Sequence, residues 1–451
     1  MKKVLFLAAA LVGTVQAQNA PDLSGRLAKA FAKAQMIDAR AERVDDVNEL
    51  RNLQQIYGYY VDEALWDQVV DLFADDGTLE TGFNGVYAGK QSIRNYLYSL
   101  TGGKPGLAQG ELNNHIQLSP VITLAPDGES ARGRWRALIQ TGSFGKGSGG
   151  NWGEGIYENE YVREGGVWKI RKLHFFVKFY APYEGGWTRG AKDYAASYGK
   201  SKVRPTRPTS VKYQAYPAQF TPPFHYENPV SSSYVFGAAN APAAAHGTPP
   251  KTVAEMEAQV RALELKLERL ESVDELDNLE AMYGYYVDGS MQDAISGLFT
   301  DDATLEILGR GVFLGRDRVY EYMRRLGAPT VGTLFNHMQL QPVVHVAPDG
   351  NTAQIRARLM VMFGQLNRSA QWGEGVYENT FVKDNGVWKY QNLHAYQTYY
   401  TNYEGGWAKH SAGMFAPFPG YPPDLPQSVA YEVYPAVFVA PFHYKNPVTG
   451  K

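Results

Sequence analysis

The chain has 451 residues, and its 44 Lys and Arg nearly balance its 46 Asp and Glu, giving a formal net charge of −2. This length predicts two or three domains, and a balanced charge without a basic stripe argues against nucleic acid as a partner. Cysteine is absent, which excludes disulfides, thiolate metal sites and thiol nucleophiles. Aromatic residues make up 13% of the chain, a composition typical of a lined pocket or a tight interface.

The first seventeen residues carry the pattern of an export signal. Lys2 and Lys3 precede an apolar run, and small residues stand around Val15 and Ala17. This is the pattern of a cleavable secretory signal peptide, which is too short for a membrane span. The sequence therefore predicts cleavage after Ala17, a periplasmic or secreted protein, and no membrane-spanning segment.

The remaining sequence contains two collinear copies of the same motifs, which predicts a tandem duplication. The motif Tyr-Gly-Tyr-Tyr-Val-Asp at 57–62 returns at 283–288, and Asn-His at 114–115 returns at 336–337. The motif Trp-Gly-Glu-Gly at 152–155 returns at 372–375, and Tyr-Glu-Gly-Gly-Trp at 183–187 returns at 403–407.

Each copy predicts the same order of elements. A long helix comes first, at about 27–63 and 253–288, and in the second copy its apolar residues recur every three or four positions. In the first copy we then expect a short helix at 66–73 ended by Asp-Asp-Gly at 75–77, a strand pair at 78–81 and 85–88, a helix at 91–100, and strands at 115–124, 130–144, 153–163 and 167–180. Helices followed by a curved antiparallel sheet make each copy α+β.

The predicted boundaries follow from composition. We expect a signal peptide at 1–17, a first domain at 18–187, a Pro- and Tyr-rich arm with a linker at 188–250, a second domain at 251–407 and a second arm at 408–451. Residues 231–250, rich in Ala, Ser, Gly and Pro, form the linker. Repetition of the arms indicates packing on a fixed surface, with a flexible tail as the alternative.

An aspartate and a histidine are the leading candidates for chemistry. Asp62 ends the first long helix, three residues after Tyr59 on the same helical face, and His115 stands in an apolar-aromatic strand. A carboxylate at one ring nitrogen would fix the tautomer and leave the other nitrogen to move a proton. Alternatively, Asp62 caps the next helix and His115 is a satisfied core residue. Their return as Asp288 and His337 favours a site.

Other repeated polar and aromatic residues are candidates for binding. They are Glu80 and Glu306, Arg134 and Arg356, and Trp152 and Trp372. Arg134 and Arg136 share one strand face, so they are either solvated surface or hold a carboxylate or a substrate oxygen. Histidine pairs with metal-ligand spacing and dense carboxylate clusters are missing, so neither a metal nor a cofactor is predicted.

This arrangement resembles the SnoaL-like branch of the NTF2-like superfamily, over about residues 40–187 and 266–407. The resemblance implies two tandem cone-shaped α+β barrels, each with a ligand at its mouth, joined as an intramolecular pseudo-dimer. A further homo-oligomer is left open. The superfamily includes polyketide cyclases, ketosteroid isomerase, scytalone dehydratase, bile-acid dehydratase, lyases that release formaldehyde from lignin-derived diaryl compounds, and pure binding modules.

The resemblance also implies roles for particular residues. Asp62 and Asp288 match the dehydratase aspartate, His115 and His337 match the histidine that transfers the proton, Tyr57 and Tyr283 resemble a tyrosine of the bile-acid enzyme, and Tyr157 and Tyr377 fall at a polar strand position of scytalone dehydratase. The second histidine of scytalone dehydratase has no counterpart, and Val61 stands where that enzyme has a tyrosine. Scytalone itself is therefore not the expected substrate.

Together these observations predict an exported, cofactor-independent lyase with one site per copy. Its substrate would be a hydroxylated phenolic aromatic compound of the lignin-derived diaryl type, which loses water or formaldehyde through a quinone methide. The expected catalytic residues are Asp62, His115, Tyr59, Asp288, His337 and Tyr285. The alternatives are a non-catalytic module that binds an aromatic or polycyclic ligand, and an enzyme like a polyketide cyclase or steroid dehydratase.

Overall fold

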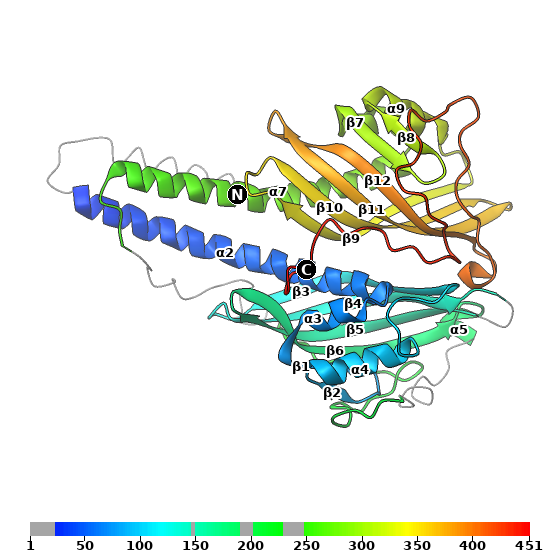
Figure 1. Cartoon of the computed structure of the whole chain (residues 1–451), viewed down its shortest axis with the longest axis horizontal. Coiled ribbons are helices and arrows are strands. Elements are labelled where there is room, and N and C mark those ends of the chain that lie inside the picture. Colours follow the sequence, from blue (N-terminus) through cyan, green and yellow to red (C-terminus); the bar gives the residue numbers. More distant parts are fainter. Residues whose placement is uncertain (1–22, 146–148, 190–201, 229–247) are drawn as a thin grey trace.

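The computed structural model describes residues 23–145, 149–189, 202–228 and 248–451 (Figure 1). The predicted signal peptide and most of the predicted linker lie outside the described residues. Within the described ranges, no helix is both long and apolar enough to cross a lipid bilayer. Below, the first repeat means the described residues from 23 to 228, and the second repeat those from 248 to 451.

Two long helices open the two repeats and run side by side in the same direction (Figure 1). They are α2 (Leu23–Asp62) and α7 (Val253–Asp288). Apolar side chains of their N-terminal halves pack against one another: Leu27, Ala30, Phe31 and Ala34 meet Met256, Val260 and Leu263. Lys266 of α7 binds Asp38 of α2 at 2.7 Å. The two helices therefore join the repeats along one seam.

Each repeat contains a six-stranded sheet, in the orders β2-β1-β6-β5-β4-β3 and β8-β7-β12-β11-β10-β9. The strands of the first are β1 (Phe73–Thr81), β2 (Val86–Ala88), β3 (Glu111–Leu124), β4 (Ser130–Ser143), β5 (Gly150–Glu164) and β6 (Val167–Pro182). Those of the second are β7 (Phe299–Ile307), β8 (Gly311–Leu314), β9 (Thr333–Val346), β10 (Thr352–Gln365), β11 (Ser369–Asp384) and β12 (Val387–Asn402).

The sheets are mixed, whereas the hairpin signals predict antiparallel pairing throughout. β1 pairs with β6, and β7 with β12, in parallel. Hairpin turns report only on strands that follow one another in the chain. They carry no information on the partner of β1, which comes from the far end of the repeat.

The shorter helices are α3 (Trp66–Asp71), α4 (Lys90–Leu100), α5 (Gly186–Arg189), α8 (Gln292–Gly297), α9 (Arg316–Arg325) and the 3-10 turn η1 (Gly406–Ala408). The predicted end of the first short helix at the Asp-Asp-Gly motif is wrong. Phe73 already begins β1, and the pairing of β1 with β6 shifts register between Phe73 and Thr78. The motif therefore forms an irregularity within β1, which explains its turn-like composition.

The arms lie on the sheets. Residues 202–228 bridge to β2 through Arg207 and reach β4, where Arg134 donates to the carbonyl of Pro223 at 3.2 Å. The C-terminal arm runs from the second repeat back to the first, in red between the two sheets in Figure 1. There Asn446 donates to the carbonyl of Gln68 at 3.0 Å.

The two repeats have the same fold but different contacts at their interface. The end of α2 lies between its own sheet and β9 of the second repeat, where Asn52 donates to Val344 at 2.9 Å. α7 turns the matching face outward, and its Tyr285 is 74% exposed. The predicted tandem α+β architecture is confirmed, with an asymmetric interface between its halves.

Candidate active site

Each repeat encloses one cavity between the inner face of its sheet, the end of its long helix and α4 or α9. The cavity of the first repeat, called the first cavity, has a volume of about 510 Å³, and the second cavity about 350 Å³. Both are lined by a histidine, a buried tyrosine pair and apolar side chains. In the first these are His115, Tyr57, Tyr157, Trp66, Phe175 and Tyr180, and in the second His337, Tyr283, Tyr377, Phe335, Phe363 and Tyr400.

A glycine lets each long helix approach the strand that carries the histidine. A Cβ on Gly58 would lie 3.1 Å from the carbonyl oxygen of His115, and one on Gly284 would lie 2.6 Å from that of His337. Any larger residue would push the strand away from the helix. These glycines thus set the distance between the helix-end aspartate and the histidine strand.

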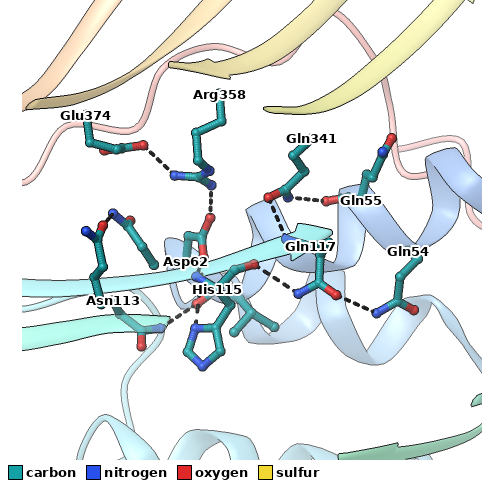
Figure 2. A network of polar contacts seen from close by, with 12 residues as sticks. Gln54, Gln55, Asp62, Asn113, His115, Gln117, Gln341, Arg358 and Glu374 are labelled. Atoms are coloured by element: carbon teal, nitrogen blue, oxygen red, sulfur yellow. Dashed lines mark hydrogen bonds and ion pairs between the residues drawn. The ribbon is translucent and has the colours of Figure 1, made fainter. Parts of the chain in front are cut away.

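The aspartate holds the histidine strand by its backbone. Asp62 Oδ1 accepts the backbone N–H of His115 at 2.5 Å, and the ring Nδ1 lies 4.0 Å from the same oxygen (Figure 2). In the second repeat Asp288 accepts the N–H of His337 at 2.5 Å, and the ring Nδ1 is 3.8 Å away. Neither Nδ1 has a hydrogen-bond partner among the described residues. The pair expected from the sequence is therefore brought together, though with a backbone contact in place of a ring hydrogen bond.

The other oxygen of Asp62 binds a residue of the second repeat. Arg358 in β10 donates to Asp62 Oδ2 and also to Glu374 in β11 (Figure 2). All three side chains are at most 5% exposed. The matching arginine of the first repeat, Arg136, is 53% exposed and binds Glu154 instead. A buried chain of charges therefore joins Glu374, which lines the second cavity, to Asp62, which holds the histidine strand of the first.

Burial sets the protonation states at the site. It raises the pKa of Asp62 to about 6, although the Arg358 guanidinium and the His115 amide oppose this shift. Burial, assisted by the positive charge of Arg358, lowers the pKa of His115 to about 4. Burial alone lowers the pKa of His337 to about 3. Both imidazoles are therefore neutral at pH 7.

A pair of tyrosines accompanies each histidine. The rings of Tyr57 and Tyr157 meet edge to face at 6.0 Å, and those of Tyr283 and Tyr377 at 6.2 Å. The two hydroxyls of each pair share a hydrogen bond. Burial raises the pKa of each tyrosine well above its usual value. These phenols therefore remain protonated and can donate hydrogen bonds to a ligand oxygen.

Both expected catalytic tyrosines lie away from the cavities. Tyr59 is buried at the repeat interface, where its hydroxyl donates to the carbonyl of Gln341 at 2.9 Å. Its ring faces the guanidinium groups of Arg356 and Arg358 at 4.7 and 5.0 Å. Its counterpart Tyr285 is exposed to solvent. Neither tyrosine lines its cavity, so neither is retained in the site proposed below.

The two expected binding glutamates face the arms. Glu80 accepts hydrogen bonds from Thr209 and Ser210 at 2.7 Å, and Glu306 accepts the N–H of Ser428 at 2.6 Å. Both follow a residue that faces the core, Leu79 or Leu305, so they point to the opposite face of the sheet. The two glutamates are therefore repeated because each one binds the arm of its own repeat.

The remaining binding candidates also lie on the outer sheet faces. Arg134 binds Glu158 and Arg356 binds Glu378, each beneath an arm. Trp152 and Trp372 meet at 5.7 Å between the repeats, and both pack with Trp407 or Tyr183. Of the substrate-binding residues expected from the sequence, the structure gathers the tyrosine pairs in the cavities and leaves these other residues outside.

Several cavity residues are absent from the sequence prediction. Tyr96 and Tyr322 line the cavities from α4 and α9, and Arg310 lines the second cavity only. The two tyrosines occupy equivalent positions in the two copies, so the repetition could have identified them as candidates. Arg310 is not repeated, because Asn84 stands at its place in the first repeat. Among the described residues, no three His, Asp or Glu side chains gather closely enough to hold a metal ion.

The SnoaL-like domain family matches twice, at residues 42–174 and 268–394. These two matches span more than half of the chain and coincide with the two sheets and their helices. The chain belongs to the SnoaL-like domain family, as a tandem pair of its domains. No curated protein matches the sequence.

Solved structures resemble single halves of the chain. A candidate scytalone dehydratase of Novosphingobium aromaticivorans is 19% identical over 34% of this chain and 95% of its own, with a TM-score of 0.28. A protein of unknown function from Mycobacterium tuberculosis is 22% identical over 29% and 73%, with a TM-score of 0.25. A hexachlorocyclohexane dehydrochlorinase, LinA type 2, is 19% identical over 34% and 98%, with a TM-score of 0.28.

Proposed function

We propose that the protein is a cofactor-independent lyase that eliminates water or formaldehyde from a hydroxylated phenolic aromatic compound, with one active site in each cavity. The observation that carries this proposal is the meeting of a neutral histidine and a protonated tyrosine pair in one largely apolar space. The aromatic side chains of each lining suit an aromatic ligand, and the histidine and the two tyrosines supply one base and two donors.

The elimination needs a base and a proton donor at the same time. In the first cavity, the neutral imidazole of His115 takes the proton of the substrate phenol, and its electrons form a quinone methide as the benzylic C–O bond breaks. Tyr57 or Tyr157 donates a proton to the leaving hydroxide, which departs as water. A proton returned from the imidazolium to the tyrosinate restores both groups. In the second step, His115 moves the proton of the neighbouring carbon to the ring oxygen, which restores the phenol and leaves a conjugated alkene. Alternatively, His115 takes the O–H proton of a neighbouring hydroxymethyl group, the C–C bond breaks to release formaldehyde, its electrons form the alkene, and the ring oxygen receives the proton.

Asp62 acts in this scheme by positioning and by charge. Its bond to the backbone N–H fixes the strand from which His115 projects, and Nδ1 faces the carboxylate. The carboxylate would therefore stabilise the imidazolium that forms when Nε2 accepts a proton. Asp288 has the same relation to His337 in the second cavity.

The test is product analysis with a 4-hydroxyphenyl compound that carries a benzylic hydroxyl, for example a lignin-derived diaryl diol. We expect mass loss of one water, or of one water together with one formaldehyde, with growth of the absorbance of a conjugated alkene. Exchange of both histidines, His115→Ala with His337→Ala, should lower the rate about 10²–10⁴-fold. The matched control is His225→Ala with His443→Ala, because these repeated histidines bind Glu158 and Glu378 outside the cavities. Full activity in the cavity double variant would remove the proposed base.

A non-catalytic binding module is the second candidate, and one observation favours it. Both oxygens of Asp62 are already engaged, by Arg358 and by a backbone N–H, so the imidazole lacks the hydrogen bond that usually orients a catalytic base. Binding of phenolic ligands to a chain that converts none of them would support this alternative.

Export forms a separate part of the proposal, because it depends on residues 1–17 alone. The protein isolated from cells should begin at Gln18 if the signal is cleaved after Ala17. N-terminal sequencing of the protein from the periplasm or the medium checks this, and an intact Met1 on the purified protein would contradict it.

A further inference from the structure

The two cavities differ by a positive charge. Arg310, in the turn between β7 and β8, lines the second cavity, and Asn84 occupies its place in the first repeat. Both residues donate to the hydroxyl of an equivalent tyrosine: Arg310 to Tyr322 at 2.6 Å and Asn84 to Tyr96 at 2.9 Å. The neutral amide of the first repeat is therefore replaced by a guanidinium at the same point of the fold.

The guanidinium of Arg310 is held without a counter-ion. It lies 4.1 Å from the ring centroid of Phe418 and 4.6 Å from that of Phe415, and its Nε faces the carbonyl of Ala416 at 3.4 Å. In the described part of the chain no carboxylate pairs with it, and no hydrogen bond of its Nη2 is found. Aromatic faces fix the position of a cation but leave its in-plane N–H groups free to bind an anion.

The rim of the first cavity has the opposite character. Glu111 lines it, where Thr333 stands in the second repeat, and its carboxylate accepts the N–H of Ala108 at 2.9 Å. At these two positions the first repeat has a glutamate and an amide, and the second has a hydroxyl and a guanidinium. Glu374 also lines the second cavity, but Arg358 pairs with its carboxylate. An anionic ligand would be repelled by Glu111 and attracted by Arg310.

The second cavity also has a more aromatic wall beside its histidine. Phe335 and Phe363 stack at 4.8 Å and flank His337 at 4.6 and 5.3 Å. Their counterparts in the first cavity are Asn113 and Thr141. A flat aromatic ligand can pack against this wall, with its charged end at the turn that carries Arg310.

We propose that the second cavity binds an aromatic carboxylate through Arg310, while the first cavity takes an uncharged phenolic compound. This inference deepens the proposed function, since it names a ligand class for one of its two sites. A carboxylate on the guanidinium forms a charge-assisted, bidentate pair, which a neutral analogue of the same shape cannot form. The two repeats thus accept different members of one family of aromatic compounds.

Calorimetric titration of the whole chain tests this without any turnover. The probes are 4-hydroxybenzoate and its uncharged analogue 4-hydroxybenzamide. We expect one equivalent of the benzoate to bind at least about tenfold more tightly than the amide. R310N, which introduces the first-repeat residue, should abolish this preference and leave amide binding within about twofold, whereas R310K should keep part of it.

Two further variants locate the effect. A395F introduces the first-repeat residue Phe175 into the wall of the second cavity, and it should remove benzoate binding. R316N is the control, because Arg316 pairs with Asp301 on the surface and does not line the cavity; it should change nothing. The inference is overturned if R310N binds the benzoate as wild type does, if binding survives A395F, or if wild type does not prefer the acid. These titrations measure binding and no product, so they can be read even if the protein has no lyase activity. For the same reason H337A should still prefer the benzoate to the amide.

Discussion

Arg358 of the second repeat places its guanidinium on the carboxylate of Asp62 in the first repeat, with 2% and 5% of the two side chains exposed. Arg358 also binds Glu374, so one cation bridges two buried carboxylates (Figure 2). Through Asp62 this contact reaches the backbone of His115 at the first cavity. The geometry of the first site therefore depends on a residue of the other repeat.

Arg358→Ala should destabilise the protein by about 3–5 kcal/mol, because it leaves two carboxylates buried without a counter-ion. The pKa of Asp62 should rise further, since the Arg358 charge now opposes the effect of burial. Urea unfolding measures the loss of free energy. The matched control is Arg136→Ala, which removes the half-exposed counterpart and should cost under about 1 kcal/mol. Equal effects of the two variants would contradict a special role for the contact between the repeats.

A second repeated pair of residues differs in the same way. Trp407 is fully buried and donates from Nε1 to the carbonyl of Thr141 in the first repeat at 2.9 Å, whereas its counterpart Trp187 is 54% exposed. Trp407→Ala should cost about 3–5 kcal/mol, because a large side chain leaves a closely packed interface. Trp187→Ala should stay within about 0.5 kcal/mol. Unfolding midpoints of the two variants provide the comparison, and a costly Trp187→Ala would count against it.

These pairs show what the sequence was able to predict. Motif repetition and hairpin turns gave the tandem α+β fold, because these signals are local to each repeat. Repetition also indicated His115, Tyr57 and Tyr157 as site residues, and the structure places all three along the first cavity. It could not separate Tyr59 from Tyr285, since the same six-residue motif is buried in one repeat and exposed in the other.

The physical reason for this limit is the asymmetry of the interface. Only one of the two long helices can lie between the sheets, and the contacts of Asn52 and Tyr59 with β9 show that α2 does so. Repeated residues on the outer sheet faces were predicted as site residues, but they hold the arms against the sheets. Residues with such a structural role are repeated in both copies just as ligand-binding residues are. Arg310 was missed for the converse reason, since it occurs in one repeat only.

The close approach of α7 to β9 gives a third prediction. A Cβ on Gly284 would meet the carbonyl oxygen of His337 at 2.6 Å, and a backbone atom in a sheet cannot move aside at little cost. Gly284→Ala should therefore destabilise by about 1–3 kcal/mol and lower any activity of the second cavity. Gly297→Ala is the control, because Gly297 ends helix α8 with open space around its Cα. It should be neutral or stabilise by up to about 1 kcal/mol. A silent Gly284→Ala would mean that the helix and strand are not in tight contact.

Buried histidines should make stability depend on pH in a defined direction. Burial lowers the pKa of His337 from 6.5 to about 3, so between these values the unfolded chain binds a proton that the folded chain does not. The contribution of His337 to stability is therefore complete above pH 6.5 and is lost as the pH falls, with a slope of up to about 1.4 kcal/mol per pH unit. Subtracting the unfolding free energy of His337→Asn from that of the wild type isolates this term.

A carboxyl group in the same protein should show the opposite sign. Burial raises the pKa of Asp277 from 3.8 to about 6, so in that window the folded chain holds a proton that the unfolded chain has released. Its contribution is present below pH 3.8 and is lost as the pH rises through 6. Urea unfolding between pH 4 and 7 should thus give a wild-type minus His337→Asn difference that shrinks toward acid, and a wild-type minus Asp277→Asn difference that grows. Differences that change in the same direction with pH would show that at least one of these groups is solvated in the folded protein. For His337 this would remove the neutral base from the second cavity.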